Sequence, residues 1–107
     1  MFRITGNKGF QLTFANGYTA SVQFGQMDYC TNRNARYCGA PERGECADAE
    51  IAVWGPSGKF ISCGGDDARG WVSSDEVAAF LGWVAAIDPG NPPERVPDFG
   101  KTKEIKP

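Results

Sequence analysis

The fold is decided by residues 10–24, which have the sequence FQLTFANGYTASVQF. Apolar and polar residues alternate on each side of Asn16-Gly17, and this period of two is typical of half-buried strands. Asn-Gly strongly favours a tight hairpin turn, because both residues tolerate positive φ angles. The segment therefore predicts a β-hairpin with its turn near residues 15–17.

The side-chain faces of the two strands select the length of that turn. A two-residue loop would place Phe14 opposite Thr19, so that apolar side chains would face polar ones. A three-residue loop at 15–17 instead places Phe14 opposite Tyr18 and buries one continuous apolar surface. The same register gives two further apolar pairs, Leu12 with Ala20 and Phe10 with Val22. We therefore expect a type I turn with Gly17 in the left-handed position of a G1 bulge.

The segments outside this hairpin predict three more strands and one helix. Alternation indicates a strand at 2–5. Two further strands, at 50–54 and 59–63, flank a Gly-Pro-Ser-Gly turn and form a second hairpin. The helix would begin at a capping box made by Ser73 and Glu76. Its apolar residues follow helical spacing and form one stripe: Val77, Phe80, Leu81, Val84 and Ile87.

This order of elements predicts an α+β fold. We expect an antiparallel sheet of about five strands, built from two hairpins, with one C-terminal helix packed on one face. A chain of 107 residues suits a single domain, which we place at residues 1–88 with an irregular loop at 25–49. The Gly-rich segment 64–70 is expected to be a polar loop. Residues 89–107 are rich in proline and poor in apolar residues, which predicts a mobile or surface-bound tail.

The overall composition excludes several classes of function. Lys plus Arg (11) and Asp plus Glu (13) leave a net charge of −2, so duplex nucleic acid is not expected as a partner. The chain has no His, which removes the usual general base and the commonest metal ligand. No apolar run has the length of a signal peptide or a membrane span, so we expect a cytoplasmic protein with reduced cysteines and no membrane partner.

The four cysteines are candidate zinc ligands. Cys30, Cys38 and Cys46 follow one another with seven intervening residues each, and Cys63 follows Cys46 after sixteen intervening residues. Four thiolates would hold a zinc ion and fix a loop that lacks a core. The short Cys-x-x-Cys spacing of most structural zinc sites is missing, so buried free thiols or a disulfide are the competing interpretations.

Aromatic and arginine residues form the candidate ligand-binding set. This composition is common at binding surfaces, where rings stack and guanidinium groups bind carboxylates or phosphates. The set consists of Tyr29, Arg33, Arg36, Tyr37, Trp54, Arg69 and Trp71. The competing interpretation is that Trp54 and Trp71 belong to the core and that the arginines are solvated. Trp83 lies off the helical stripe and would mark a further partner face.

Catalytic motifs are weak or missing. Asp66 and Asp67 could hold a divalent metal ion in a hydrolase or nuclease, but two adjacent carboxylates without other support are a weak signal. The chain has no nucleophile elbow, no phosphate-binding P-loop and no dinucleotide fingerprint. We therefore expect a protein that is not an enzyme and has no catalytic residues.

Three short segments resemble compact accessory proteins of tailed bacteriophages. These are residues 14–18 (FANGY), 21–25 (SVQFG) and 49–55 (AEIAVWG), in a likeness that covers about residues 2–87. The motifs are structural, so the resemblance assigns no functional residue. Phage proteins of this kind often inhibit host defence by binding an effector protein or by sequestering a nucleotide signal, which implies a location in the host cytosol.

The sequence as a whole favours a non-enzymatic binding protein that acts by stoichiometric capture. Its partner would be a host protein or a small nucleotide-like ligand, and no cofactor would be needed. The alternatives are a small zinc-stabilised interaction domain and, with least support, a metal-dependent hydrolase. An open edge strand would also allow a homodimer.

Overall fold

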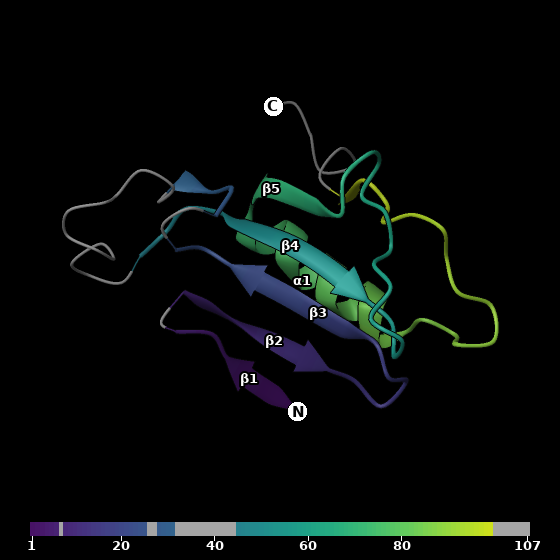
Figure 1. Ribbon diagram of the computed structural model, residues 1–107. Helices are drawn as coiled ribbons and strands as arrows, with labels where there is room; N and C mark the ends of the chain where they lie inside the picture. The colour runs from purple at the N-terminus through teal and green to yellow at the C-terminus, as the bar shows by residue number, and fades with distance from the viewer. Residues whose placement is uncertain (7, 26–27, 32–44, 100–107) are drawn as a thin grey trace.

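The computed structural model describes residues 1–6, 8–25, 28–31 and 45–99. It contains five strands and one helix: β1 (Phe2–Ile4), β2 (Gly9–Thr13), β3 (Thr19–Gln23), β4 (Ala49–Trp54), β5 (Ala68–Val72) and α1 (Ser74–Ala85). The strands form one antiparallel sheet in the order β1-β2-β3-β4-β5, and α1 lies across one face, against β3 and β4 (Figure 1). The predicted α+β fold is confirmed. Within the described ranges, no helix is long and apolar enough to cross a membrane.

The hairpin of β2 and β3 has the predicted register. Its apolar residues pair as expected, with Phe10 opposite Val22 and Leu12 opposite Ala20. The backbone N–H of Phe14 donates to the carbonyl of Tyr18 over 2.9 Å, which closes the three-residue loop. Gly17 has a φ of +89°, the left-handed conformation that the G1 bulge requires.

The prediction of a second hairpin is wrong, because residues 59–63 do not form a strand along β4. After β4 the chain makes only a short contact with this strand. The Ile61 backbone N–H donates to the carbonyl of Val53 over 2.9 Å, and Phe60 forms an isolated β-bridge with Trp54. Ser62 then pairs with Arg95 instead of continuing along β4. The segment that pairs with β4 is β5, which includes residues we expected to form a polar loop. A register shift between Ala49 and Ile51 in β4 marks an irregularity in this pairing.

The helix begins and packs as the sequence predicts. The Ser73 side chain accepts from the Glu76 backbone N–H over 3.3 Å, and the Glu76 carboxylate accepts from the Ser73 N–H over 2.8 Å. Phe80 and Val84 are completely buried. On the same side of the sheet they meet apolar residues of the two central strands, namely Ala20, Val22, Ile51 and Val53. These contacts form the core, because they remove the apolar stripe of α1 from water.

Asn16 connects the first hairpin to the end of the helix. Its side-chain amide donates to the carbonyls of Val84 (2.9 Å), Ala85 (3.3 Å) and Ile87 (3.0 Å). Its side-chain oxygen accepts from the backbone N–H of Tyr18 over 3.0 Å. The last turn of α1 contains no basic residue, and the Asn16 amide supplies hydrogen bonds to carbonyl groups at and just beyond the helix end. One side chain therefore fixes both the turn and the docking of α1.

The segment that follows the helix completes the core. Val96 is fully buried and its backbone N–H donates to the carbonyl of Ser62 over 2.8 Å. Phe99 contacts Phe80 and Trp83 with ring centroids 6.4 Å and 6.1 Å apart. Residues 89–99 are thus part of the packed domain. Trp83, which we expected to mark a partner face, is half-buried under this segment.

The strand β1 lies at one edge of the sheet. Its apolar side chains Phe2 and Ile4 are 74% and 80% exposed, because α1 covers the central strands and does not reach this edge. Such an edge can pair with another strand. The homodimer stays a prediction.

Candidate functional site

Trp71 has an unusual backbone conformation. Its φ is +52°, and it is the only residue other than glycine with a positive φ among those that the structure describes. In the left-handed region Cβ approaches the following carbonyl oxygen, which costs about 1–2 kcal/mol for a residue that has a side chain. The Trp71 backbone N–H donates to the carbonyl of Tyr29 over 2.8 Å, and this bond holds the strained conformation. Strain that the surrounding structure maintains is concentrated at functional sites in proteins.

The side chains of Tyr29 and Trp71 form an exposed aromatic pair. Their rings are stacked with centroids 5.8 Å apart and an interplanar angle of 29°. Tyr29 is 44% exposed and Trp71 is 58% exposed, although large aromatic residues are usually more buried. Gly70 makes room for the pair, because a Cβ there would lie 2.9 Å from the Tyr29 carbonyl oxygen. An exposed, rigid aromatic pair is the kind of surface that anchors protein partners.

Hydrogen bonds on both sides of Tyr29 fix its position. Before it, the Asp28 carboxylate accepts from the backbone N–H of Gly25 over 2.9 Å. After it, the Thr31 backbone N–H donates to the Asp48 carboxylate over 2.6 Å. Asp28 precedes Tyr29 directly in the chain, and the Asp48 carboxylate accepts from the backbone N–H of Thr31, two residues after Tyr29.

Among the predicted ligand-binding residues that the structure describes, Tyr29 and Trp71 come together and the others do not. Trp54 lies at the end of β4, whereas Trp71 lies beside the start of β4. The Trp54 ring packs on Phe60, with ring centroids 5.3 Å apart. Arg69 donates from its two terminal nitrogens to the carbonyls of Pro97 (2.6 Å) and Val96 (3.1 Å), so it holds the C-terminal segment. The other predicted members lie outside the described residues: Arg33, Arg36 and Tyr37.

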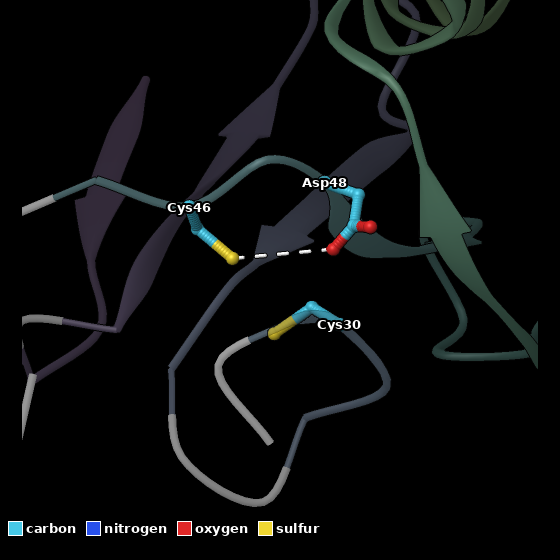
Figure 2. A group of neighbouring side chains, drawn as sticks. All are labelled: Cys30, Cys46 and Asp48. Atoms are coloured by element: carbon cyan, nitrogen blue, oxygen red, sulfur yellow. Dashed lines mark hydrogen bonds between the residues drawn. The ribbon is translucent and has the colours of Figure 1, made fainter. Parts of the chain in front are cut away.

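Two of the predicted zinc ligands also come together, and a carboxylate lies close to both. Figure 2 shows Cys30, Cys46 and Asp48 around one small volume, and one ligand atom from each lies within 4.8 Å of the others. Cys30 follows Tyr29 and is buried, whereas Cys46 and Asp48 lead into β4. Spacing alone could not identify Asp48, because it is one of 13 acidic residues and belongs to no known ligand pattern.

The other predicted metal ligands within the described residues do not join this group. Cys63 lies after the contact with β4, and its thiol is 3.8 Å from the carbonyl oxygen of Asp67. Burial raises the pKa of the Cys63 thiol, while the positive charge of Arg69 opposes the rise. Asp66 and Asp67 are exposed and belong to no cluster of three or more ligand residues in the described ranges. Cys38 lies outside the described residues.

Comparison with protein-family models, curated proteins and solved structures finds no match for this chain. The resemblance to phage accessory proteins therefore remains an expectation from the sequence. The function has to be argued from the geometry of the aromatic pair and of the cysteine-containing group.

Proposed function

We propose that this chain is a non-enzymatic binding domain whose partner is a protein, and that Tyr29 and Trp71 anchor the complex. The observation that carries the proposal is Trp71 itself, which is 58% exposed and lies on a backbone with a φ of +52°. A strained backbone that presents a large apolar ring to water lowers stability twice over. A partner that covers the ring would give this arrangement a function.

The charges near the pair favour a protein over a nucleotide-like ligand. Asp28 and Asp48 flank Tyr29, and Arg69 uses its terminal nitrogens on the C-terminal segment. A phosphate would meet negative charge here, whereas a lysine or arginine of a protein partner could lie over an aromatic face near these carboxylates. If the resemblance to phage proteins holds, the partner is a host protein and the chain acts by stoichiometric capture.

The binding prediction is tested with Trp71→Ala and a matched control, Phe60→Ala. Phe60 is also an exposed aromatic residue, at 41%, but it lies beside Trp54 at the other end of β4. For a partner isolated with the parent chain, Trp71→Ala should weaken binding by at least about 2 kcal/mol, the range of an aromatic hot spot. Phe60→Ala should bind as the parent does. Isothermal titration calorimetry with the purified partner measures both affinities.

Two results would contradict the proposal. If both variants bind the partner as tightly as the parent chain, the aromatic pair is not the anchor. If native mass spectrometry shows a retained ligand of nucleotide mass and Trp71→Ala still retains it, the nucleotide-like alternative is correct and its site lies elsewhere.

The backbone strain at Trp71 gives a separate prediction about stability. We expect Trp71→Gly to unfold with a free energy about 1 kcal/mol higher than Trp71→Ala, because glycine adopts a positive φ without the Cβ contact. Both variants remove the same indole ring, so lost packing on Tyr29 cancels in the comparison. Urea denaturation followed by circular dichroism gives the two free energies. A lower stability for Trp71→Gly would show that residue 71 does not have this φ in solution.

A further inference from the structure

Two thiols and one carboxylate converge at the start of β4. The possible ligand atoms of Cys30, Cys46 and Asp48 all lie within 4.8 Å of one another, and the Cys46 sulfur is 4.0 Å from the Asp48 oxygen Oδ1 (Figure 2). Ligands about 2.0–2.3 Å from a tetrahedral zinc ion are separated from one another by distances close to these. The three side chains therefore need little movement to share one ion.

Thr31 orients the carboxylate of this group. Its backbone N–H donates to Asp48 Oδ1 over 2.6 Å, and its hydroxyl lies 2.9 Å from both carboxylate oxygens. An ionised carboxylate has about four lone-pair positions, so these bonds leave capacity for a metal ion. Carboxylates that bind metals are usually held by such outer hydrogen bonds, which fix their direction.

The two thiols differ in access. Cys30 is 1% exposed, and its sulfur lies 3.5 Å from the carbonyl oxygen of Gly25. Cys46 and Asp48 line an open recess of about 200 Å³ beside the first turn of α1. An ion from solvent can therefore reach the group from the side of Cys46.

We propose that Cys30, Cys46 and Asp48 bind one Zn²⁺ ion. Two thiols select zinc over Mg²⁺ and Ca²⁺, which prefer oxygen ligands, and a carboxylate oxygen completes a three-ligand zinc set. On binding, two Zn–S bonds and one Zn–O bond form, and the two S–H bonds break and release their protons to the buffer. No electron is transferred, and the fourth position of the ion remains for a further ligand.

The zinc site is proposed separately from the protein-binding function, with which it shares Asp48, and it differs from the four-cysteine site that the sequence suggested. Asp48 takes part, and Cys63 does not. The ion would connect the chain just after Tyr29 to the chain just before β4. Because binding to the folded state stabilises it by mass action, zinc should raise the melting temperature of the chain.

The test uses the full chain, purified under reducing conditions, and measures Zn²⁺ affinity by competition with a chromophoric chelator. Native mass spectrometry should show one zinc ion per chain. Cys46→Ser and Asp48→Asn should each weaken zinc binding by more than about 100-fold, because loss of an outer-shell partner alone costs about 10- to 100-fold. Thr31→Val, which removes that outer hydroxyl, should weaken zinc binding by about 10- to 100-fold. The matched control Cys63→Ser should bind zinc like the parent.

Circular dichroism of each variant without metal checks that the variant is folded. Cys46 is preferred over Cys30 for substitution, because Cys46 is only half-buried and its replacement disturbs the core less. The proposal is overturned if the folded parent chain retains no zinc at micromolar free Zn²⁺. It is also overturned if Asp48→Asn binds as tightly as the parent. A loss in Cys63→Ser equal to that in Cys46→Ser would restore the four-cysteine set in its place.

Discussion

Replacing Val96 with Asp is expected to lower the free energy of unfolding by about 3–5 kcal/mol, the cost of an uncompensated buried charge. Val96 is fully buried and belongs to the same core cluster as Ile61, Phe80 and Val84. Arg69 lies close to Val96 in the fold, but its guanidinium donates to the backbone carbonyls of Val96 and Pro97. The introduced carboxylate would therefore lie among apolar side chains.

Two further variants make this result specific. Val96→Thr keeps the side-chain volume and adds one hydroxyl. Its free energy of unfolding should fall by about 1–3 kcal/mol, the desolvation cost of one unsatisfied polar group. Glu94→Ala alters an exposed side chain two residues away and should stay within about 0.5 kcal/mol of the parent. Urea unfolding followed by circular dichroism measures all three. If Val96→Asp is as stable as Glu94→Ala, the C-terminal segment is not part of the core in solution.

The burial of Val96 is a feature that the composition of its segment does not predict. Residues 89–99 have a composition typical of a surface-bound or mobile tail, and Val96 and Phe99 are isolated apolar residues without a period of two or 3.6. Their burial depends on Ser62 and Trp83, which are distant in sequence. Composition averages over a segment, whereas one or two well-placed apolar side chains decide whether it docks.

Local physical rules correctly predicted the first hairpin and the start and apolar stripe of the helix. The register of the first hairpin follows from which face each side chain occupies, and Gly17 adopts the required positive φ. The capping box at Ser73 and the apolar stripe of α1 follow from spacing within one helix. Each of these features depends on residues within a few positions of one another.

The strand β5 and the candidate site depend on longer contacts, and the sequence predicted them only in part. Residues 59–63 follow a Gly-Pro-Ser-Gly turn, which favours them as the partner of β4, but Ser62 pairs with Arg95. Tyr29 and Trp71 were both candidates, yet their stacking could not be predicted once β5 was assigned to a loop. Asp48 was missed because only the fold brings it to Cys30 and Cys46.

Replacing Asn16 with Asp is expected to lower the free energy of unfolding by about 2–4 kcal/mol, from lost hydrogen bonds and from charge repulsion at the helix end. The Asn16 amide donates to three carbonyls at and beyond the last turn of α1. A carboxylate has no N–H to donate and adds negative charge where the helix dipole is already negative. The bond from the Tyr18 N–H to the side-chain oxygen can persist, so the turn itself should survive.

A comparison with Asn16→Ala separates the two causes. Alanine removes the same two N–H donors without adding charge, and it also removes the oxygen that accepts from the Tyr18 N–H. The charge–dipole term should therefore count against Asn16→Asp by about 0.3–1 kcal/mol in low salt. That difference should shrink at high ionic strength, because salt screens the repulsion. A stability difference between the two variants that does not change with ionic strength would leave hydrogen bonding as the whole effect.

The pH dependence of the Asn16→Asp variant provides a second check on the charge term. Repulsion by the helix end would raise the pKa of the introduced carboxyl in the folded state above the usual value of about 3.9. A carboxyl with a raised folded pKa destabilises the protein fully above that pKa, and the penalty disappears as the pH falls below the unfolded pKa. The stability gap between Asn16→Asp and Asn16→Ala should therefore narrow between about pH 6 and pH 4. A gap that widens as the pH falls would mean that the carboxylate is stabilised at position 16, and that the Asn16 side chain does not face the helix carbonyls.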